Sequence, residues 1–228
     1  MEPLRLAVPN KGRLLEPSER LLRDAGLQFE RGTRALTVPV RNVPIELMYV
    51  RTDDVSEMVA DGVAGAGITG LDLVGEADAG LEVVVELGYG RCRLMAAVAN
   101  SSQVESLDGL DGLRVATAHP GLTGRLLDER GIDVTVVPLR GSVEVAPRLD
   151  VADAIVDLVS SGSTMRVNGL RPLGTLLESQ AVLTAPPEAG EAVGRLAGML
   201  QAVVAGRTRR YLMMNAPGEA VDEIAALI

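Results

Sequence analysis

The chain has few aromatic residues, one cysteine and one histidine among its 228 residues. Aromatic residues make up 2% of the sequence and Trp is absent, so the core has to be built from Leu, Val, Ile, Ala and Met. The single cysteine, Cys92, excludes an internal disulfide, fits a reducing compartment, and is interpreted as a small packed residue. The single histidine, His119, has no Ser or Cys nucleophile pattern nearby and is expected to be structural. The sequence therefore offers no His/Cys zinc cluster.

Basic residues are outnumbered, with 22 Lys and Arg against 31 Asp and Glu and a net charge of −9. This balance argues against a nucleic-acid partner, which needs a basic face, but not against a phosphorylated small molecule. Long hydrophobic runs are missing as well, since none reaches the roughly 18 residues of a membrane span. The N-terminal MEPLRLAVPNKGRL lacks the features of a signal peptide. We therefore expect a cytoplasmic protein with no membrane partner.

Glycine, by contrast, is abundant at 25 residues, and apolar segments alternate with helical patterns along the chain. This combination predicts an α/β fold with tight turns and mostly parallel sheets joined by right-handed crossovers. Strands are expected at residues 4–8, 35–40, 45–50, 64–68, 81–87, 93–99, 114–117, 134–138, 152–157, 181–184 and 210–214. Helices are expected up to residue 25 and at residues 53–60, 71–74, 122–130, 143–149, 188–205 and 217–227.

Residues 152–168 hold the pattern that says most about function. A buried strand is followed by a loop of small residues, and then by a short helix that ends at Asn168-Gly169. The loop residues are Ser160, Ser161, Gly162, Ser163 and Thr164. Glycine lets the backbone approach an anion, and hydroxyl and N–H groups at a helix start donate to it, so the pattern predicts a phosphate site. An ordinary strand–turn–helix with an N-capping serine is the alternative.

Asp157 lies just before this loop, where a carboxylate could accept ribose hydroxyls or hold a Mg²⁺ ion shared with a pyrophosphate. The sequence G-x-x-x-x-G-K-[ST] does not occur, so the expected phosphate belongs to something other than a hydrolysed nucleoside triphosphate. Asp153 lies on the same face of a regular strand as Asp157 and is a second, weaker candidate.

The stretch EVAPRLDVADAIVDLVSSGSTM at residues 144–165 resembles the signature of the ATP phosphoribosyltransferases, the first enzymes of histidine biosynthesis. The matching residues are Glu144, Ala152, Ile155, Asp157, Ser161, Gly162, Thr164 and Met165. One departure is Asp150, where the family usually has Gly, and it concerns the local turn geometry more than the chemistry. Six further blocks follow the order of the family, at residues 4–14, 59–74, 87–94, 114–123, 168–183 and 209–217. The resemblance therefore covers nearly the whole chain.

The resemblance implies a two-lobed fold of the type II periplasmic-binding-protein kind, with a cleft between the lobes. Lobe I would comprise residues 1–92 and 182–228. Lobe II would comprise residues 93–181 and carry the phosphoribosyl pyrophosphate loop. The chain would cross between the lobes near residues 90–95 and 178–183.

The reaction implied is transfer of the 5-phosphoribosyl group from phosphoribosyl pyrophosphate to N1 of the adenine of ATP. The loop from Ser161 to Thr164 would hold the 5′-phosphate, while Asp157 and Glu144 would address the ribose. Lys11 and Arg51, with Mg²⁺ as the cofactor, would take the charge of the pyrophosphate, and Arg34 is a weaker candidate for that task. A solvated Lys11, an exposed Arg34 and a Glu144–Arg140 surface pair are the alternatives.

Residues Thr69-Gly70-Leu71 end a glycine-rich strand and begin a helix, so they could receive the base or a phosphate of the nucleotide. A turn that lets the helix pack close to the sheet is an equally good interpretation of them. Two other classes of protein remain open: a type I phosphoribosyltransferase, which usually has two adjacent acids where this chain has Asp157-Leu158, and a non-catalytic two-lobed binding module.

The expected partners are ATP, phosphoribosyl pyrophosphate and further copies of the chain, with a dimer favoured. The chain ends at Ile228, before the C-terminal histidine-binding domain of long family members. We therefore expect a catalytic core without a histidine site, either a long form lacking that domain or a natural short form. A short form would need a regulatory subunit resembling histidyl-tRNA synthetase.

Overall fold

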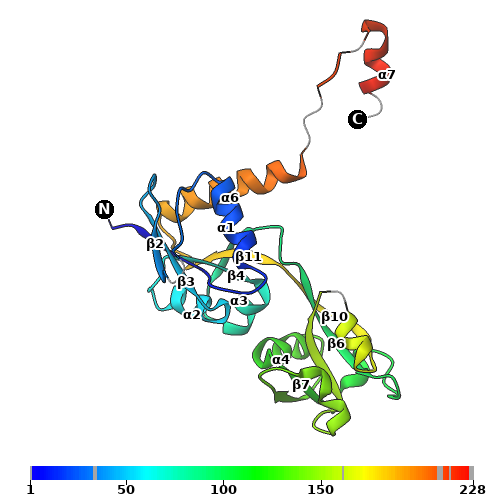
Figure 1. The fold of residues 1–228 in the computed structure, drawn as a ribbon. Coiled ribbons are helices and arrows are strands. Elements are labelled where there is room, and N and C mark those ends of the chain that lie inside the picture. Colours follow the sequence, from blue (N-terminus) through cyan, green and yellow to red (C-terminus); the bar gives the residue numbers. More distant parts are fainter. Residues whose placement is uncertain (1, 33–34, 161, 210–212, 216, 226–228) are drawn as a thin grey trace.

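The computed structural model describes residues 2–32, 35–160, 162–209, 213–215 and 217–225, and these form two lobes joined by extended strands (Figure 1). Lobe I is built on a six-stranded sheet of order β2-β3-β1-β4-β11-β5. Lobe II is built on a five-stranded sheet of order β10-β6-β9-β7-β8. The α/β class and the two-lobed architecture expected from the sequence are confirmed.

Lobe I carries helices on both faces of its sheet (Figure 1). Leu21 of α1 and Leu196 of α6 pack on one face with Leu6 and Leu183, while Val55 of α2 packs on the other. The strands are β1 (Leu4–Pro9), β2 (Thr37–Pro39), β3 (Ile45–Val50), β4 (Ala66–Gly70), β5 (Glu82–Glu86) and β11 (Ala181–Ala185). The helices are α1 (Leu15–Asp24), α2 (Val55–Ala60), α3 (Leu71–Ala77) and α6 (Glu191–Thr208).

Lobe II has a core on each face of its sheet, and the central strand β9 serves both. Val156 packs on the face covered by α4, and Ile155 packs on the face covered by α5 and the turn at Val143. The strands are β6 (Cys92–Ala99), β7 (Arg114–Thr117), β8 (Thr135–Pro138), β9 (Ala154–Val159) and β10 (Leu170–Ser179). The helices are α4 (Pro120–Asp128), α5 (Ser163–Val167) and the 3-10 turns η2 (Asp108–Leu110), η3 (Val143–Val145) and η4 (Pro147–Leu149).

Both sheets are mixed, so parallel pairing is less dominant than the alternation predicted. The described strands make four parallel pairings, β1 with β3 and β4, and β7 with β8 and β9. Five further pairings are antiparallel. The reason is that the strands leading between the lobes, β6 and β10, run antiparallel to each other, and β11 enters the first sheet antiparallel to β4. The sequence analysis missed β10.

Several helix ends follow from local chemistry. α1 stops before Gly26, which has a φ of +86°, and the helix after the small-residue loop stops before Gly169, with a φ of +70°. At the start of α2, a 3-10 turn, η1 (Thr52–Asp54), leads into the helix, and no side chain caps it.

The C-terminal region beyond α6 contains η5 (Gly218–Ala220) and α7 (Val221–Ala225), which lie away from both lobes (Figure 1). The strand expected at residues 210–214 lies mostly outside the described residues, and so does the end of the helix expected to reach residue 227. Across the described parts of the chain, no helix combines the length and the apolar character needed to cross a membrane.

Candidate active site

The small-residue loop follows the carboxyl end of β9 and opens onto a cavity of about 190 Å³. Gly162 is the N-cap of α5 and has a φ of +73°, a left-handed conformation that side chains other than glycine rarely adopt. The cavity brings together five of the predicted site residues: Glu144, Asp157, Ser160, Gly162 and Thr164. The loop predicted to hold a phosphate therefore shares one cavity with the two carboxylates predicted to address the ribose.

Asp157 is a partly buried carboxylate of this cavity whose pKa is raised. Burial raises its pKa, the Leu158 N–H that donates to Oδ1 at 2.8 Å partly offsets this effect, and the negative charge of Glu144 adds to the increase. The expected alternative, a Glu144–Arg140 pair, is not among the ion pairs of the described residues. The charged form of an acid held in this way is stabilised when a ligand brings a cation or a hydroxyl donor close to it.

A second cavity, of about 270 Å³, lies between the lobes. Lobe I lines it with Lys11, Arg13, Thr52, Asp53, Gly70 and Asp72, and lobe II with His119 and Leu158. Leu158 also lines the loop cavity, so the two cavities adjoin at β9. The predicted cleft residue Lys11 thus faces the same region as the phosphate loop, from the other lobe.

A third cavity, of about 500 Å³, lies along the strands that join the lobes and is lined by Arg91, Arg93, Glu178 and Gln180. It shares Val159 and Ser160 with the loop cavity. Three adjoining cavities therefore surround the carboxyl end of β9, enough for two ligands that have to meet.

Asp153, predicted as a weaker substrate-binding candidate, lies away from these three cavities and is not among their lining residues. It precedes β9 at the opposite end of the strand, where its carboxylate accepts hydrogen bonds from the Arg114 backbone N–H at 2.9 Å and from the Arg114 guanidinium at 2.9 and 3.1 Å. These hydrogen bonds lower the pKa of Asp153. Its shared face with Asp157 does not bring the two together, because the strand separates them by about 13 Å.

Asp150, where the resembling family usually has Gly, adopts the backbone conformation that glycine would favour, with a φ of +54°. Its carboxylate lies 2.9 Å from the Arg114 guanidinium, which also donates to the Asp150 carbonyl at 3.0 Å. The turn is therefore kept, because Asp is among the few residues that tolerate this conformation.

Among the described residues, most of the other predicted site residues do not line the cavity between the lobes. Thr69 is fully buried and its hydroxyl donates to the Thr52 carbonyl at 2.9 Å, so that side chain joins β4 to the turn after β3. Gly70 lines the cavity between the lobes, whereas Leu71 and Arg51 are not among its lining residues. Arg51 is exposed beside Thr52, which does line it. Ser163 is exposed on the loop, and Arg34 and Ser161 lie outside the described residues.

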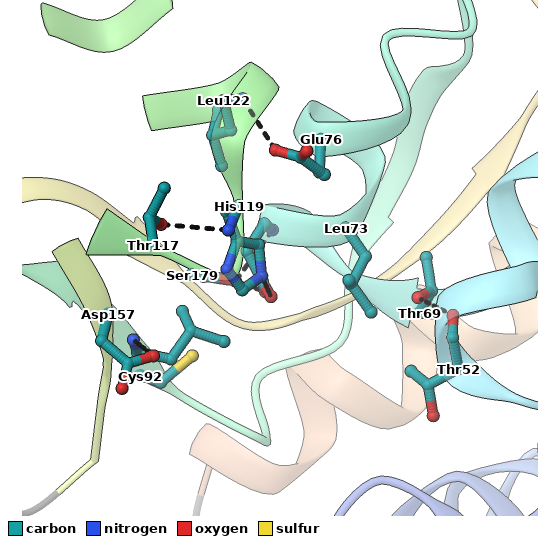
Figure 2. Close-up of polar contacts among 12 residues, drawn as sticks. Thr52, Thr69, Leu73, Glu76, Cys92, Thr117, His119, Leu122, Asp157 and Ser179 are labelled. Carbon is teal, nitrogen blue, oxygen red and sulfur yellow. Dashed lines mark hydrogen bonds and ion pairs between the residues drawn. The ribbon is translucent and has the colours of Figure 1, made fainter. Parts of the chain in front are cut away.

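Two polar residues that the sequence analysis missed, Asp72 and Ser179, meet His119 where the lobes touch. Figure 2 shows Ser179 beside His119. Asp72 of α3 accepts a short hydrogen bond from the Ser179 hydroxyl at the end of β10 and lies 3.4 Å from Nε2 of His119. Burial acts to lower the pKa of His119, but the hydrogen bond and charge of Asp72 outweigh it and the pKa is raised. His119 thus has a structural contact, as expected, and this contact joins the two lobes.

Arg13 was also missed, although it belongs to the quoted Asn10-Lys11-Gly12-Arg13 block. Its guanidinium donates to the Gly90 carbonyl at 2.8 Å and to Cys92 Sγ at 3.1 Å, and it lines the cavity between the lobes. The position of Arg13 beside Lys11 in the same turn was the signal that could have identified it.

The fold and these cavities define a two-lobed α/β protein with a polar cleft between its lobes. The same fold is found in the substrate-binding protein of an amino acid ABC transporter, with a TM-score of 0.57 and 12% identity over 89% of this chain and 91% of that one. A likeness at this identity establishes the fold alone.

Closer relatives identify the family. The family model HisG, ATP phosphoribosyltransferase, matches residues 51–203. The ATP phosphoribosyltransferase of Gemmatimonas aurantiaca is 44% identical over 99% of this chain and 81% of its own length, and that of Methanopyrus kandleri is 42% identical over 98% and 80%. The solved ATP phosphoribosyl transferase (HisG:HisZ) complex from Thermotoga maritima has a TM-score of 0.75 at 28% identity, over 89% of this chain and 99% of that one.

The chain belongs to the ATP phosphoribosyltransferase family. Its activity is that of a pentosyltransferase, which transfers 5-phosphoribosyl from phosphoribosyl pyrophosphate to N1 of the adenine of ATP, the first step of histidine biosynthesis. Enzymes of this family need a divalent metal ion.

Proposed function

We propose that the loop cavity binds the phosphoribosyl half of phosphoribosyl pyrophosphate. Ser160, Gly162 and Thr164, together with Ser161 and Ser163, would hold the 5′-phosphate, and Asp157 and Glu144 would address the ribose. The observation that carries this proposal is the shared cavity in which the loop faces both carboxylates. Phosphate binding where a strand ends and a helix begins is a recurring use of free backbone N–H groups.

The pyrophosphate and the nucleotide would then occupy the cavity between the lobes. Lys11 supplies positive charge there, and Arg51, beside Thr52, is within reach for a long flexible side chain. Gly70, at the end of β4, would allow close approach of the base or a phosphate, and Leu71 would begin the helix beside it. Arg34 stays a weaker candidate for the same charge.

Catalysis needs no nucleophile from the protein in this arrangement. The adenine N1 forms a bond to the anomeric carbon while the bond from that carbon to the pyrophosphate oxygen breaks, and the electron pair of that bond leaves on the pyrophosphate. The side chains act by holding two polyanions face to face and by stabilising the charge that develops on the leaving group.

We infer that Mg²⁺ is the metal and that Asp157 is its protein ligand, with Glu144 nearby. The described residues contain no cluster of three or more His, Cys, Asp or Glu side chains that could hold a metal ion. Two carboxylates beside a phosphate loop fit the usual binding of Mg²⁺, which keeps much of its coordination for substrate phosphates and water. When bound, the ion would supply charge neutralisation for the pyrophosphate.

The assembly and the location of the protein complete the proposal. We propose lobe boundaries at residues 1–92 plus 182–228 and 93–181, close to where β6 and β11 begin. We propose a dimer of this chain, and a regulatory subunit resembling histidyl-tRNA synthetase as a further partner. The likeness to a chain solved in a HisG:HisZ complex supports a second kind of subunit. We propose the cytoplasm as the compartment, in keeping with the single buried cysteine. Light scattering that gives the mass of one 23.9 kDa chain would contradict the dimer.

The direct test is to incubate the protein with ATP, phosphoribosyl pyrophosphate and MgCl₂ while recording the absorbance of N1-substituted adenine and the release of pyrophosphate. We expect both signals to rise together and to disappear when either substrate or the metal is omitted. Product from another base but not from ATP would favour a type I phosphoribosyltransferase. Binding without pyrophosphate release would favour a binding module.

The role of Arg51 can be tested in the same assay. If it meets the pyrophosphate mainly as it departs, Arg51→Ala should lower kcat more than it raises KM, and Arg51→Lys should recover only part because lysine cannot offer a bidentate contact. A normal kcat in Arg51→Ala would identify a surface charge.

A further inference from the structure

The contact between the lobes at α3 and α4 is made by polar groups from both helices (Figure 2). α4 begins with Pro120, which has no N–H, so Gly121 and Leu122 carry the first free amides of the helix. Glu76 of α3 accepts hydrogen bonds from both, at 3.0 Å from the Gly121 N–H and 2.7 Å from the Leu122 N–H. A carboxylate from lobe I therefore caps a helix of lobe II, where the helix dipole favours negative charge.

The return contacts run from α4 to the end of α3. The Arg125 guanidinium donates a short hydrogen bond to the Gly75 carbonyl and lies 3.4 Å from the carboxylate of Asp78. The helices also approach closely at Gly75, where an added Cβ would lie 3.0 Å from Leu122 Cδ1. With the Asp72–His119 contact, three separate polar links join these helices.

This contact lies beside the cavity between the lobes. α3 follows directly from Gly70 in the lining of the cavity between the lobes, and α4 follows directly from His119 in the same lining. Glu76 itself is not among the residues that line the three cavities around β9. An effect of Glu76 on the site would therefore have to run through the relative position of the lobes.

We propose that Glu76 is a positioning residue for the phosphoribosyl transfer, because its cap on α4 holds the lobes in the arrangement in which the lobe I cleft residues face the lobe II phosphate loop. The inference rests on the proposed placement of the two substrates in adjoining cavities. Without the cap, more of the protein would adopt an open arrangement of the lobes. The affinity for a substrate that contacts both lobes would then fall in proportion to the fraction of protein that stays closed.

The test combines kinetics with a distance measurement in the full chain. Spin labels at Asp61→Cys in lobe I and Glu129→Cys in lobe II, both at exposed positions, report the distance between the lobes by electron double resonance, while Cys92 is buried. Glu76→Ala should lengthen or broaden the distance distribution and raise KM for both substrates about tenfold while kcat changes much less, because saturating substrate closes the lobes again.

Three further variants sharpen the result. Glu76→Gln, which keeps one acceptor oxygen, should restore part of the affinity. Gly75→Leu should open the lobes by steric contact with Leu122 and reproduce the rise in KM without a change in charge. Glu57→Gln, which removes an exposed carboxylate from the neighbouring helix α2, should leave the distance and KM unchanged.

Thermal melting of each variant confirms that it is folded. Unchanged KM in Glu76→Ala, or a raised KM with an unchanged distance between the lobes, would overturn the inference. A lowered KM in Glu76→Ala would also overturn it. That result would mean that Glu76 occupies α4 amides to which a substrate phosphate binds. An inactive wild type would instead contradict the proposed function.

Discussion

The two ends of strand β9 carry the same residue type in opposite circumstances. At its amino end, Asp153 is bound by the backbone and the guanidinium of Arg114, and its pKa is lowered. At its carboxyl end, Asp157 receives one hydrogen bond from the neighbouring Leu158 N–H, has Glu144 as a negative neighbour, and its pKa is raised. One carboxylate is fully paired within the protein, and the other is the one that we propose binds a ligand.

The difference contrasts an acid that is paired within the fold with an acid for which we propose a role in binding. An acid paired with arginine stabilises the folded state, whereas a half-buried acid beside another acid lowers stability until a ligand supplies the missing partner. The same Asp→Asn substitution is therefore expected to have opposite effects at the two ends of β9. Comparing the two variants is a sharper test than measuring either one alone.

The largest effect is expected from Asp157→Asn. Loss of the carboxylate that addresses the ribose or the metal should lower kcat/KM by about 100–1,000-fold. Because the folded pKa of Asp157 lies above its ordinary value, stability falls as pH rises through that pKa, and at neutral pH the charged group destabilises the fold. The variant should therefore melt up to about 2 °C higher than the wild type at pH 7.

Asp153→Asn is the matched control for this prediction, since it makes the same change on the same strand. Its kcat/KM should stay within about twofold of the wild type, because Asp153 lies at the far end of the strand from the loop. Equal losses of activity in the two variants would show that both act through folding, and the functional contrast between the ends of β9 would fail.

Thr164→Ala tests the loop end in isolation. A lost hydrogen bond to a charged phosphate should weaken binding of phosphoribosyl pyrophosphate about 10- to 100-fold, measured by calorimetry, with little change in melting temperature. Gly162→Val should act more strongly, because a β-branched residue is strained at a φ of +73°. Wild-type affinity in Thr164→Ala would remove the loop from the phosphate site.

At the other end of β9, Asp153→Asn should lower the melting temperature by about 2–4 °C at pH 7, an amount limited by the exposure of the pair. The folded pKa of Asp153 is depressed, so its contribution is present above the ordinary value of 3.8 and is lost as pH falls through the folded pKa. The melting curves of wild type and variant should therefore converge in acid. A gap that persists in acid would indicate packing as the cause.

Local patterns predicted most of the fold. β7 and β3 have the bounds that the sequence predicted, because short apolar runs between turn residues define them. β10 was missed because LRPLGTLLES contains Pro and Gly, and its pairing with β6 shifts register at Pro172/Gly174 and Thr175/Leu177. An edge strand tolerates such residues, and no alternation signals it in the sequence.

The candidate site also has a part that the sequence predicted and a part that it did not. Glu144, Asp157 and Gly162 were predicted by a contiguous motif, and the structure brings them to one cavity. The contacts of Asp72 with His119 and of Glu76 with α4 join segments more than 40 residues apart. They depend on how the two lobes meet, and neither periodicity nor spacing in the sequence carries that information.

The smallest effect is expected at Asp150, which supports the amino end of β9. Asp150→Gly removes an ion pair whose acid is 94% exposed, and such pairs contribute little. It also relieves the cost of a φ of +54° but adds freedom to the unfolded chain. These terms oppose each other, so the melting temperature should stay within about 2 °C of the wild type. Asp150→Ala loses the pair and keeps the backbone cost, so it should melt below Asp150→Gly. The reverse order would show that the freedom glycine adds to the unfolded chain outweighs the backbone cost of alanine at this turn.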